Sequence, residues 1–208
     1  GFAAVEELLP VAPNAFDLIL SIGLLRWAND LPGALIRLRE ALTPDGLFLG
    51  AMVGGASLQE LRTAFLEAEA ELEGGASPRV APMVDLRDLG TLLQRAGFAL
   101  PVTDTDRVRI EFSSPFKLLA DLRAMGATNA LTARRKQPLA RATLARAMEI
   151  YSERFAAPED KVSATFEILH ASGWAPHPSQ QQPLKPGSAK ASLASALMNF
   201  DASKNGSS

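Results

Sequence analysis

The sequence predicts an α/β protein built on one end of a doubly wound sheet, and three observations support this. Residues 16–21 and 47–53 are nearly continuous apolar runs separated by a helical pattern, which together make a strand–helix–strand unit with parallel strands. Residues 107–112 and 162–168 alternate apolar and polar side chains, as strands with one exposed face do. The length of 208 residues and a composition that is 47% apolar and 21% charged fit one globular domain.

The composition excludes several classes of function. Cysteine is absent, so a disulfide framework, a thiolate metal site and a cysteine nucleophile are excluded. The two histidines, His170 and His177, have no third ligand at usable spacing, and we expect no metal site. The formal net charge of −2 gives no reason to expect nucleic acid as a partner. The longest apolar stretch, residues 16–25, contains Asp17 and is too short to span a membrane, so we expect a cytoplasmic protein.

The first strand and the first helix have clear boundaries. The apolar run at residues 16–21 predicts a strand that is buried on both faces. Asp30 is placed to cap the following helix, with Pro32 in its first turn. Residues 43–46 read Thr-Pro-Asp-Gly, which is turn chemistry and separates the helix from the second buried strand at residues 47–53.

Two more helices follow the second strand. Ser57 and Glu60 have the spacing of a capping box, which predicts a helix from there to about Glu73. Asp85 is placed to cap the next helix, which Gly97 ends. Four acidic residues of the first of these helices are interpreted as its solvated face, namely Glu67, Glu69, Glu71 and Glu73.

The second half of the chain predicts helices inserted between the last two strands. The insertion covers about residues 114–157, a place where α/β enzymes often carry a substrate cap. An open α/β sheet binds its ligand at the carboxyl ends of its strands, which here are residues 21–27 and 53–56. Residues 178–186 predict a loop, and residues 201–208 predict a disordered tail.

Several segments resemble class I S-adenosylmethionine-dependent methyltransferases. The resemblance to the fourth and fifth strands of that fold is carried by FDLILS, WANDLP and LTPDGLFL, at residues 16–21, 27–32 and 42–49. Three further segments narrow it, namely GGASPR, DLRAMGATNA and SGWAPHPSQ, at residues 74–79, 121–130 and 172–180. Together they are similar to bacterial relatives of the mitochondrial complex I assembly-factor methyltransferase-like protein. They are more distantly similar to the malonyl-carrier-protein methyltransferase of biotin synthesis.

The resemblance implies a Rossmann-like sheet that binds S-adenosylmethionine and methylates a small acid, a carrier-bound acyl group or a protein side chain. It leaves open a non-enzymatic or hydroxylase-type assembly factor for respiratory complex I-like machinery. The family's glycine-rich cofactor loop has no counterpart in the sequence, so residues 1–200 resemble the C-terminal two-thirds of one such domain. We therefore expect the coding DNA upstream of Gly1 to encode that loop, and we expect enzyme activity of the complete protein.

The resemblance also implies where the cofactor binds. The loop after the first strand would pass beside the sulfonium, and Trp27 would wall the methyl-transfer pocket, although a core role is the alternative for an aromatic side chain. Val5 stands where the family has an adenine-contacting acid, so a neighbouring glutamate either replaces it or is a solvated loop carboxylate. The cofactor-binding candidates are Glu6, Glu7, Ser21, Ile22, Gly23, Leu24 and Trp27. No catalytic side chain is identified.

The substrate-binding candidates come from the segments of the narrower resemblance. They are Arg79, Arg123, Thr128, Asn129, Trp174 and His177. An arginine at such a point either holds a carboxylate or phosphate through two hydrogen bonds or forms a surface salt bridge. His177 either acts as a general base or makes a structural hydrogen bond. The expected partner is a small-molecule or protein substrate. Because a half-sheet with an exposed central strand tends to associate, we also expect a homodimer.

Overall fold

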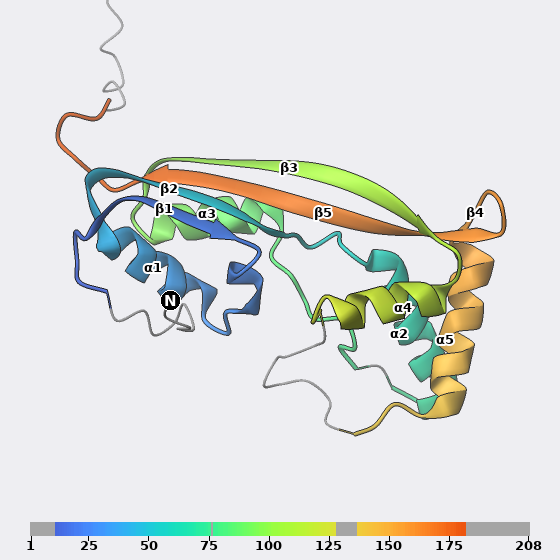
Figure 1. Cartoon of the computed structure of the whole chain (residues 1–208). Coiled ribbons are helices and arrows are strands. Elements are labelled where there is room, and N and C mark those ends of the chain that lie inside the picture. The colour runs from blue at the N-terminus through green and yellow to red at the C-terminus, as the bar shows by residue number, and fades with distance from the viewer. Residues whose placement is uncertain (1–10, 76, 128–136, 182–208) are drawn as a thin grey trace, which may run out of the picture. The chain divides into compact units, whose positions relative to one another are not determined.

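The structure is a computed structural model that describes residues 11–75, 77–127 and 137–181 (Figure 1). The chain divides into two compact units, residues 1–177 and 178–208, and every helix and strand named below lies in the first. Among the described residues, no helix is long and apolar enough to cross a membrane. The predicted tail lies outside the described part of the chain.

A five-stranded sheet organises the first unit (Figure 1). Its strands are β1 (Phe16–Ile22), β2 (Leu42–Val53), β3 (Ala99–Phe112), β4 (Ala156–Ala157) and β5 (Lys161–Trp174). The order across the sheet is β1-β2-β5-β3, and β4 pairs with the start of β5. β1 and β2 are parallel, whereas β5 is antiparallel to both β2 and β3. The predicted strand–helix–strand unit and the two later strands are therefore confirmed.

The last two strands are longer than their alternating patterns predict. β3 already begins at Ala99, and its first residues pair with the end of β5 as far as Trp174. The ladder is irregular between Ala99 and Val102, where Pro101 has no N–H to donate. Pairing with β5 thus extends β3 through residues whose own sequence pattern is weak.

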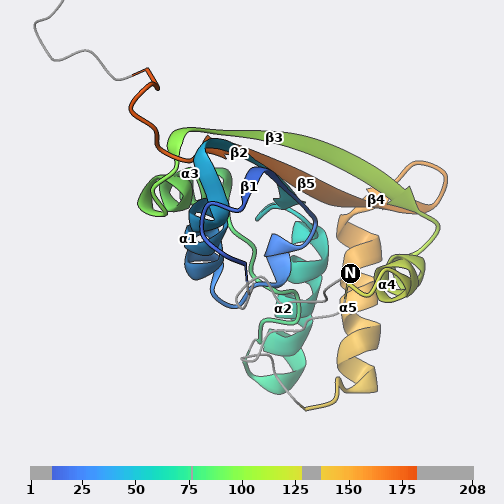
Figure 2. The ribbon, with the colours of Figure 1, turned by 60° about the vertical axis from the view of Figure 1, so that its left-hand side comes forward.

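The helices lie on the same side of the strands in both views (Figures 1 and 2). They are η2 (Leu25–Trp27), α1 (Leu31–Ala41), α2 (Gln59–Glu73), α3 (Leu86–Arg95), α4 (Pro115–Ala124) and α5 (Arg141–Arg154). α4 and α5 follow β3 and precede β5 in the chain, so the predicted helical insertion between the last two strands is confirmed. α2 packs along α5, and α3 packs on β3.

Two of the predicted helix caps are confirmed. The Asp30 carboxylate accepts a hydrogen bond from the Gly33 N–H at 2.9 Å, with Pro32 in the first turn of α1. The Asp85 carboxylate accepts one from the Asp88 N–H at 2.7 Å at the start of α3. Each bond satisfies a backbone donor that the first helical turn leaves without an intrahelical partner.

The predicted capping box at the start of α2 is wrong. Leu58 occupies the N-cap position with φ 54°, and no side chain caps the helix. The Ser57 hydroxyl instead donates to the Glu167 carbonyl at 3.1 Å and accepts from the Glu167 N–H at 2.8 Å. The Glu60 carboxylate accepts from the Thr165 N–H at 3.1 Å. Both side chains of the motif therefore bind β5, because a buried strand offers them backbone partners that a local motif cannot reveal.

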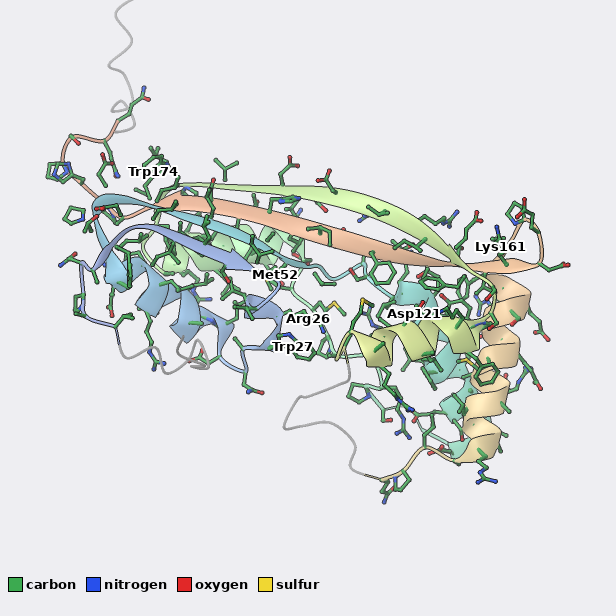
Figure 3. The ribbon with its side chains drawn as sticks, viewed as in Figure 1. Arg26, Trp27, Met52, Asp121, Lys161 and Trp174 are labelled. Atoms are coloured by element: carbon green, nitrogen blue, oxygen red, sulfur yellow. The ribbon has the colours of Figure 1, made fainter. Side chains whose placement is uncertain are left out.

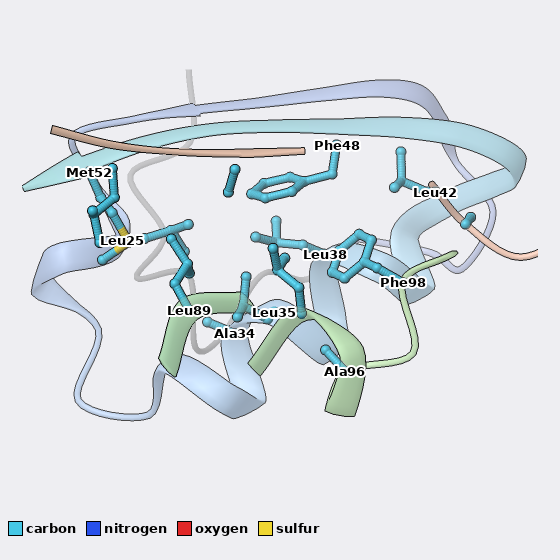
Figure 4. Close-up of a cluster of buried hydrophobic side chains, with 14 residues drawn as sticks. Leu25, Ala34, Leu35, Leu38, Leu42, Phe48, Met52, Leu89, Ala96 and Phe98 are labelled. Atoms are coloured by element: carbon cyan, nitrogen blue, oxygen red, sulfur yellow. The ribbon is translucent and has the colours of Figure 1, made fainter. Parts of the chain in front are cut away.

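Two hydrophobic clusters lie beneath the sheet. The first packs α1 and α3 against β2 and β5, and includes Leu35, Phe48 and Leu89 (Figure 4). The second packs α2, α4 and α5 together around Tyr151 and Ala147. We call them the α1–α3 cluster and the α2–α5 cluster.

The prediction that β1 is buried on both faces is wrong. Ile19 packs against the α1–α3 cluster, and Ser21 is buried. The alternate side chains are open to solvent, with Leu18 50%, Leu20 59% and Ile22 75% exposed. The reason is that α1 and α3 cover one face of the sheet, whereas no described residue covers the other face of β1.

Candidate functional site

A cavity of about 340 Å³ lies where α2, α4 and α5 meet the turn that follows β1. Its walls are mostly hydrocarbon, from Leu58, Leu61 and Phe65 of α2, Leu119 and Leu122 of α4, and Leu139 and Leu144 at the start of α5. Residues 79–83, in the connection between α2 and α3, close another side. Three arginines also line it, namely Arg26, Arg79 and Arg123.

The turn after β1 carries the chain from the sheet to the cavity. Gly23 has φ 74°, and its N–H donates to the Ala51 carbonyl at 2.8 Å, which extends the pairing of β1 and β2. That left-handed backbone is easy for glycine and strained for other residues. Leu25 is then buried in the α1–α3 cluster, and this anchor places Arg26 and Trp27 on the cavity wall (Figure 3).

Arg26 and Trp27 form a stacked pair. The Arg26 guanidinium carbon lies 3.8 Å from the centroid of the Trp27 ring, which is a cation–π contact. Burial lowers the pKa of Arg26, because a low-dielectric site disfavours the charged form. Trp27 was predicted from the sequence, whereas its basic neighbour Arg26 was not. The available signal was only its place at the carboxyl end of β1, where an open α/β sheet binds ligands.

Arg79 is held in place by a buried carboxylate. The side chain of Glu69 is completely buried, and Arg79 Nε donates to it at 2.5 Å. The Ser77 N–H and hydroxyl also donate to Glu69, at 2.5 and 2.8 Å. Burial by itself would raise the pKa of Glu69, but the hydrogen bonds from Ser77 and Arg79 outweigh it and hold the pKa below its ordinary value.

Glu69 was predicted to lie on a solvated helix face, and that prediction is wrong. Its carboxylate fixes the segment after α2 against the helix, and so sets the position of Arg79 on the cavity wall. The predicted solvent exposure is confirmed for Glu67 and Glu71, which are 40% and 47% exposed. These two glutamates pair with Arg154 and Arg146 of α5.

A second buried carboxylate ties α2 to the sheet. Glu167 of β5 is 5% exposed and accepts from the Ala56 N–H at 3.0 Å and from Arg107 Nε at 2.9 Å. Together with the bonds of Ser57 and Glu60 to β5, this fixes the start of α2. Leu58 and Leu61 of the cavity wall follow directly from that start, so the network positions the cavity without touching it.

Among the described residues, the charged side chains on the cavity wall are all basic. Three arginines line it, and no aspartate or glutamate does among the described residues. Glu69 balances the charge of Arg79. Within the described part of the chain, neither Arg26 nor Arg123 forms an ion pair with a carboxylate. Two guanidinium charges therefore act on a largely apolar space, where they are screened less than in water.

The predicted cofactor residues cluster at the carboxyl end of β1. Ser21 is buried, whereas Ile22 and Leu24 are 75% and 57% exposed, and the space beside Gly23 is open. This edge offers backbone groups and apolar surface that fit one wall of a site for S-adenosylmethionine. Glu6 and Glu7 lie outside the described residues, so their predicted role at the adenine stays a prediction.

The predicted substrate residues separate into three groups. Arg79 and Arg123 lie on the wall of the same cavity as Trp27. Trp174, the last residue of β5, pairs with Leu47 in the middle of β2, away from the carboxyl ends of the parallel strands (Figure 3). Neither Trp174 nor His177 lines the cavity. The remaining two, Thr128 and Asn129, lie outside the described residues. The described residues contain no group of three side chains suited to hold a metal ion.

Comparison with known proteins identifies the fold. Residues 3–50 match the Methyltransferase domain family. A candidate methyltransferase from Bacillus halodurans superposes with a TM-score of 0.52 at 12% identity, over 84% of this chain and 76% of that one. The chain has the class I methyltransferase fold. The YcgJ protein from Bacillus subtilis supports the same fold, with a TM-score of 0.52 at 13% identity over 83% of this chain and 69% of that one.

The sequence of the chain is similar to two groups of curated proteins. It is 45% identical over 191 residues to the mitochondrial arginine-hydroxylase NDUFAF5 of Danio rerio, covering 92% of this chain and 59% of that protein. The human protein of that name is 43% identical over 91% of this chain and 55% of its own length. The malonyl-[acyl-carrier protein] O-methyltransferase of Halorhodospira halophila is 34% identical over 80% of this chain and 54% of its own. The chain thus spans little more than half the length of these relatives. The cytoplasmic location expected from the sequence stays a prediction.

Proposed function

We propose that this chain is part of an S-adenosylmethionine-dependent methyltransferase, and that the substrate of this enzyme enters the cavity lined by Trp27, Arg79 and Arg123. The observation that carries the proposal is that the carboxyl end of β1 leads directly into this cavity through η2. An open α/β sheet binds its ligand at that edge, so a cofactor there would face a substrate in the cavity. The substrate is a small acid, a carrier-bound acyl group or a protein side chain.

Each part of the site has a role in this proposal. S-adenosylmethionine would supply an electrophilic methyl group. The backbone from Ser21 to Leu24 would line its binding site, and the Trp27 ring would form part of the wall between the cofactor and the substrate. The apolar walls exclude water, and the arginines orient the substrate.

Catalysis by positioning suits this cavity. No aspartate, glutamate or histidine is found among the described residues that line it. Methyl transfer to an oxygen or nitrogen that is already nucleophilic does not require a strong side-chain base. Holding the acceptor in line with the methyl group then supplies much of the rate enhancement, because it removes the entropy cost of the encounter.

A second candidate function comes from the identity with the arginine-hydroxylases, which exceeds that with the O-methyltransferases. In this alternative the chain belongs to a hydroxylase-type or non-enzymatic assembly factor for respiratory complex I-like machinery. The cavity itself does not favour an arginine substrate, because a substrate guanidinium would meet the like charges of the arginines that line it.

Cofactor binding tests the proposal. Isothermal titration of the complete protein should show that it binds S-adenosylmethionine. Trp27→Leu should weaken this binding about twofold to thirtyfold, because it removes apolar surface from the wall of the site. Trp174→Leu is the matched control, because Trp174 lies outside the cavity. A complete protein that is folded and does not bind S-adenosylmethionine would refute the proposal and favour the assembly factor.

A further inference from the structure

We propose that the cavity binds a carboxylate carried on an apolar chain, with Arg26 and Arg123 pairing with the carboxylate and the leucines of α2 and α4 contacting the chain. This deepens the proposed function by naming the class of substrate, and it rests on that function only in treating the bound acid as the substrate. It follows from the charges, the burial and the size of the cavity.

The three arginines on the wall are not equivalent. Arg79 is 13% exposed and is already paired with the buried Glu69, so its position is structural and its charge is balanced. Arg26 and Arg123 have no carboxylate partner among the described residues. A guanidinium offers a planar fork that matches a carboxylate through two parallel hydrogen bonds. The anion therefore belongs with Arg26 and Arg123.

Arg26 is set up to receive an anion. Its guanidinium is stacked on Trp27 at 3.8 Å, which fixes the plane of the fork before any ligand arrives. Arg26 is half-buried, and this burial lowers its pKa because the charged form is less well solvated there than in water. An incoming carboxylate would restore favourable interactions that the buried cation has lost to desolvation. An incoming ammonium or guanidinium would add repulsion to that cost.

The rest of the wall selects an apolar body. Leu58 at the N-cap of α2, Leu61 and Phe65 of α2, and Leu119 and Leu122 of α4 all line the cavity. The volume of about 340 Å³ is near the lower end of the range of about 300–1,000 Å³ for small-molecule sites. A single alkyl chain suits such a space, and each methylene that it buries strengthens binding about fourfold.

The test uses Trp27 as a reporter. The sequence contains two tryptophans, so Trp174→Phe leaves Trp27 as the sole indole, in contact with Arg26. In the absence of S-adenosylmethionine, its fluorescence is titrated with octanoate, octan-1-ol, octylamine and acetate. Octanoate should produce a saturable change. Octanol should bind at least about tenfold more weakly because it has no charge for the guanidinium groups. Octylamine and acetate should show no saturable binding.

Variants assign the contacts. Arg123→Gln and Arg26→Gln should each weaken octanoate binding by about tenfold to hundredfold, with little effect on octanol. Arg95→Gln is the control, because Arg95 is an exposed arginine of α3 that does not line the cavity. Arg123 is exposed at the cavity, so its replacement should leave the fold intact. Binding to the Arg26 variant is measured by isothermal titration, because loss of the stacked cation changes the fluorescence of Trp27 itself.

The outcomes separate this inference from the proposed function. Equal binding of octanol and octanoate, binding of octylamine as tight as that of octanoate, or an Arg123→Gln protein with unchanged octanoate affinity would overturn the inference. If octanoate binds as expected but S-adenosylmethionine does not, the methyltransferase proposal fails and the carboxylate site remains. If S-adenosylmethionine binds and octanoate does not, the carboxylate site is refuted and the methyltransferase proposal remains.

Discussion

The two hydrophobic clusters are built on different principles. The α1–α3 cluster is closed by hydrocarbon alone, with Phe48 and Leu35 fully buried at its centre (Figure 4). The α2–α5 cluster is accompanied by buried polar side chains. Among the described residues, every buried polar side chain except Ser21 lies on or next to α2, α5 or β5, namely Ser57, Glu60, Glu69, Thr143, Ser163 and Glu167.

The difference follows from the cavity. Side chains that line an empty space have no partner atoms on one side, so apolar packing alone leaves their positions poorly defined. Hydrogen bonds are directional, and a satisfied buried network specifies one arrangement. The α1–α3 cluster therefore supplies stability, and the polar network of the α2–α5 cluster maintains the shape of the site. Predictions for each region test this division.

The largest expected loss of stability is in the α1–α3 cluster. Phe48 is fully buried, and its ring centroid lies 5.4 Å from that of Phe98. Phe48→Ala should lower the free energy of unfolding by about 3–5 kcal/mol, as measured by urea unfolding, because it leaves a cavity that rigid neighbours cannot fill. Phe116→Ala, at a position that is 56% exposed, should cost less than about 0.5 kcal/mol. Similar losses for both variants would show that the cluster is not the source of stability.

A smaller loss is expected when the buried ion pair of the other region is broken. Glu69→Gln keeps the shape of the side chain but leaves the nearly buried charge of Arg79 without its partner. The free energy of unfolding should fall by about 1–3 kcal/mol. Octanoate affinity should fall as well, because the segment that carries Arg79 forms a wall of the cavity. Glu40→Gln, at a 53% exposed ion pair of α1, should change neither quantity appreciably.

The same variant predicts a pH dependence with a definite sign. The pKa of Glu69 is lowered from 4.5 in the folded protein, so its contribution to stability is fully present above about pH 4.5. That contribution is lost as the pH falls from about 4.5 through the lowered pKa, because in this range the unfolded state binds a proton at Glu69 more readily than the folded state does. The stability difference between the wild type and Glu69→Gln should therefore shrink on acidification below pH 4.5 in urea titrations. A difference that stays constant down to pH 3 would contradict the assignment.

Local signals in the sequence predicted much of the fold. The caps at Asp30 and Asp85 were identified because a cap and its helix lie within four residues of each other. Ser57 and Glu60 have equally good local spacing, yet they bind β5, more than 100 residues away in the sequence. Local patterns thus hold where no buried long-range partner competes.

Glu69 shows a different limit. Alternate residues of an α-helix lie about 200° apart around its axis, so glutamates at every second position cannot share one face. Glu67 and Glu71 are half-exposed, whereas Glu69 is buried against Ser77 and Arg79. The helical spacing could have shown that this carboxylate points elsewhere. Its partners come from a segment outside the helix, so the spacing could not have identified them.

The site was predicted only in part. Trp27, Arg79 and Arg123 were selected through the family resemblance, and the structure brings them to one cavity. Arg26 was not, because its importance comes from stacking and burial, which spacing does not encode. The walls of the cavity come from helices on both sides of β3 in the sequence. No single segment contains enough of the site to reveal it.

The smallest expected effect on stability is at the open face of β1. Its side chains are apolar, like those of the α1–α3 cluster, but no described helix packs on them. Leu20 is 59% exposed there, so Leu20→Gln should change the free energy of unfolding by less than about 0.5 kcal/mol. The homodimer predicted from the sequence would pair two copies through the exposed edge of β1, and the open apolar face lies beside that edge. Sedimentation velocity should then show concentration-dependent association of the wild type and weaker association of Leu20→Gln. A wild type that sediments as a monomer at every concentration would show that apolar side chains on this face do not by themselves cause association.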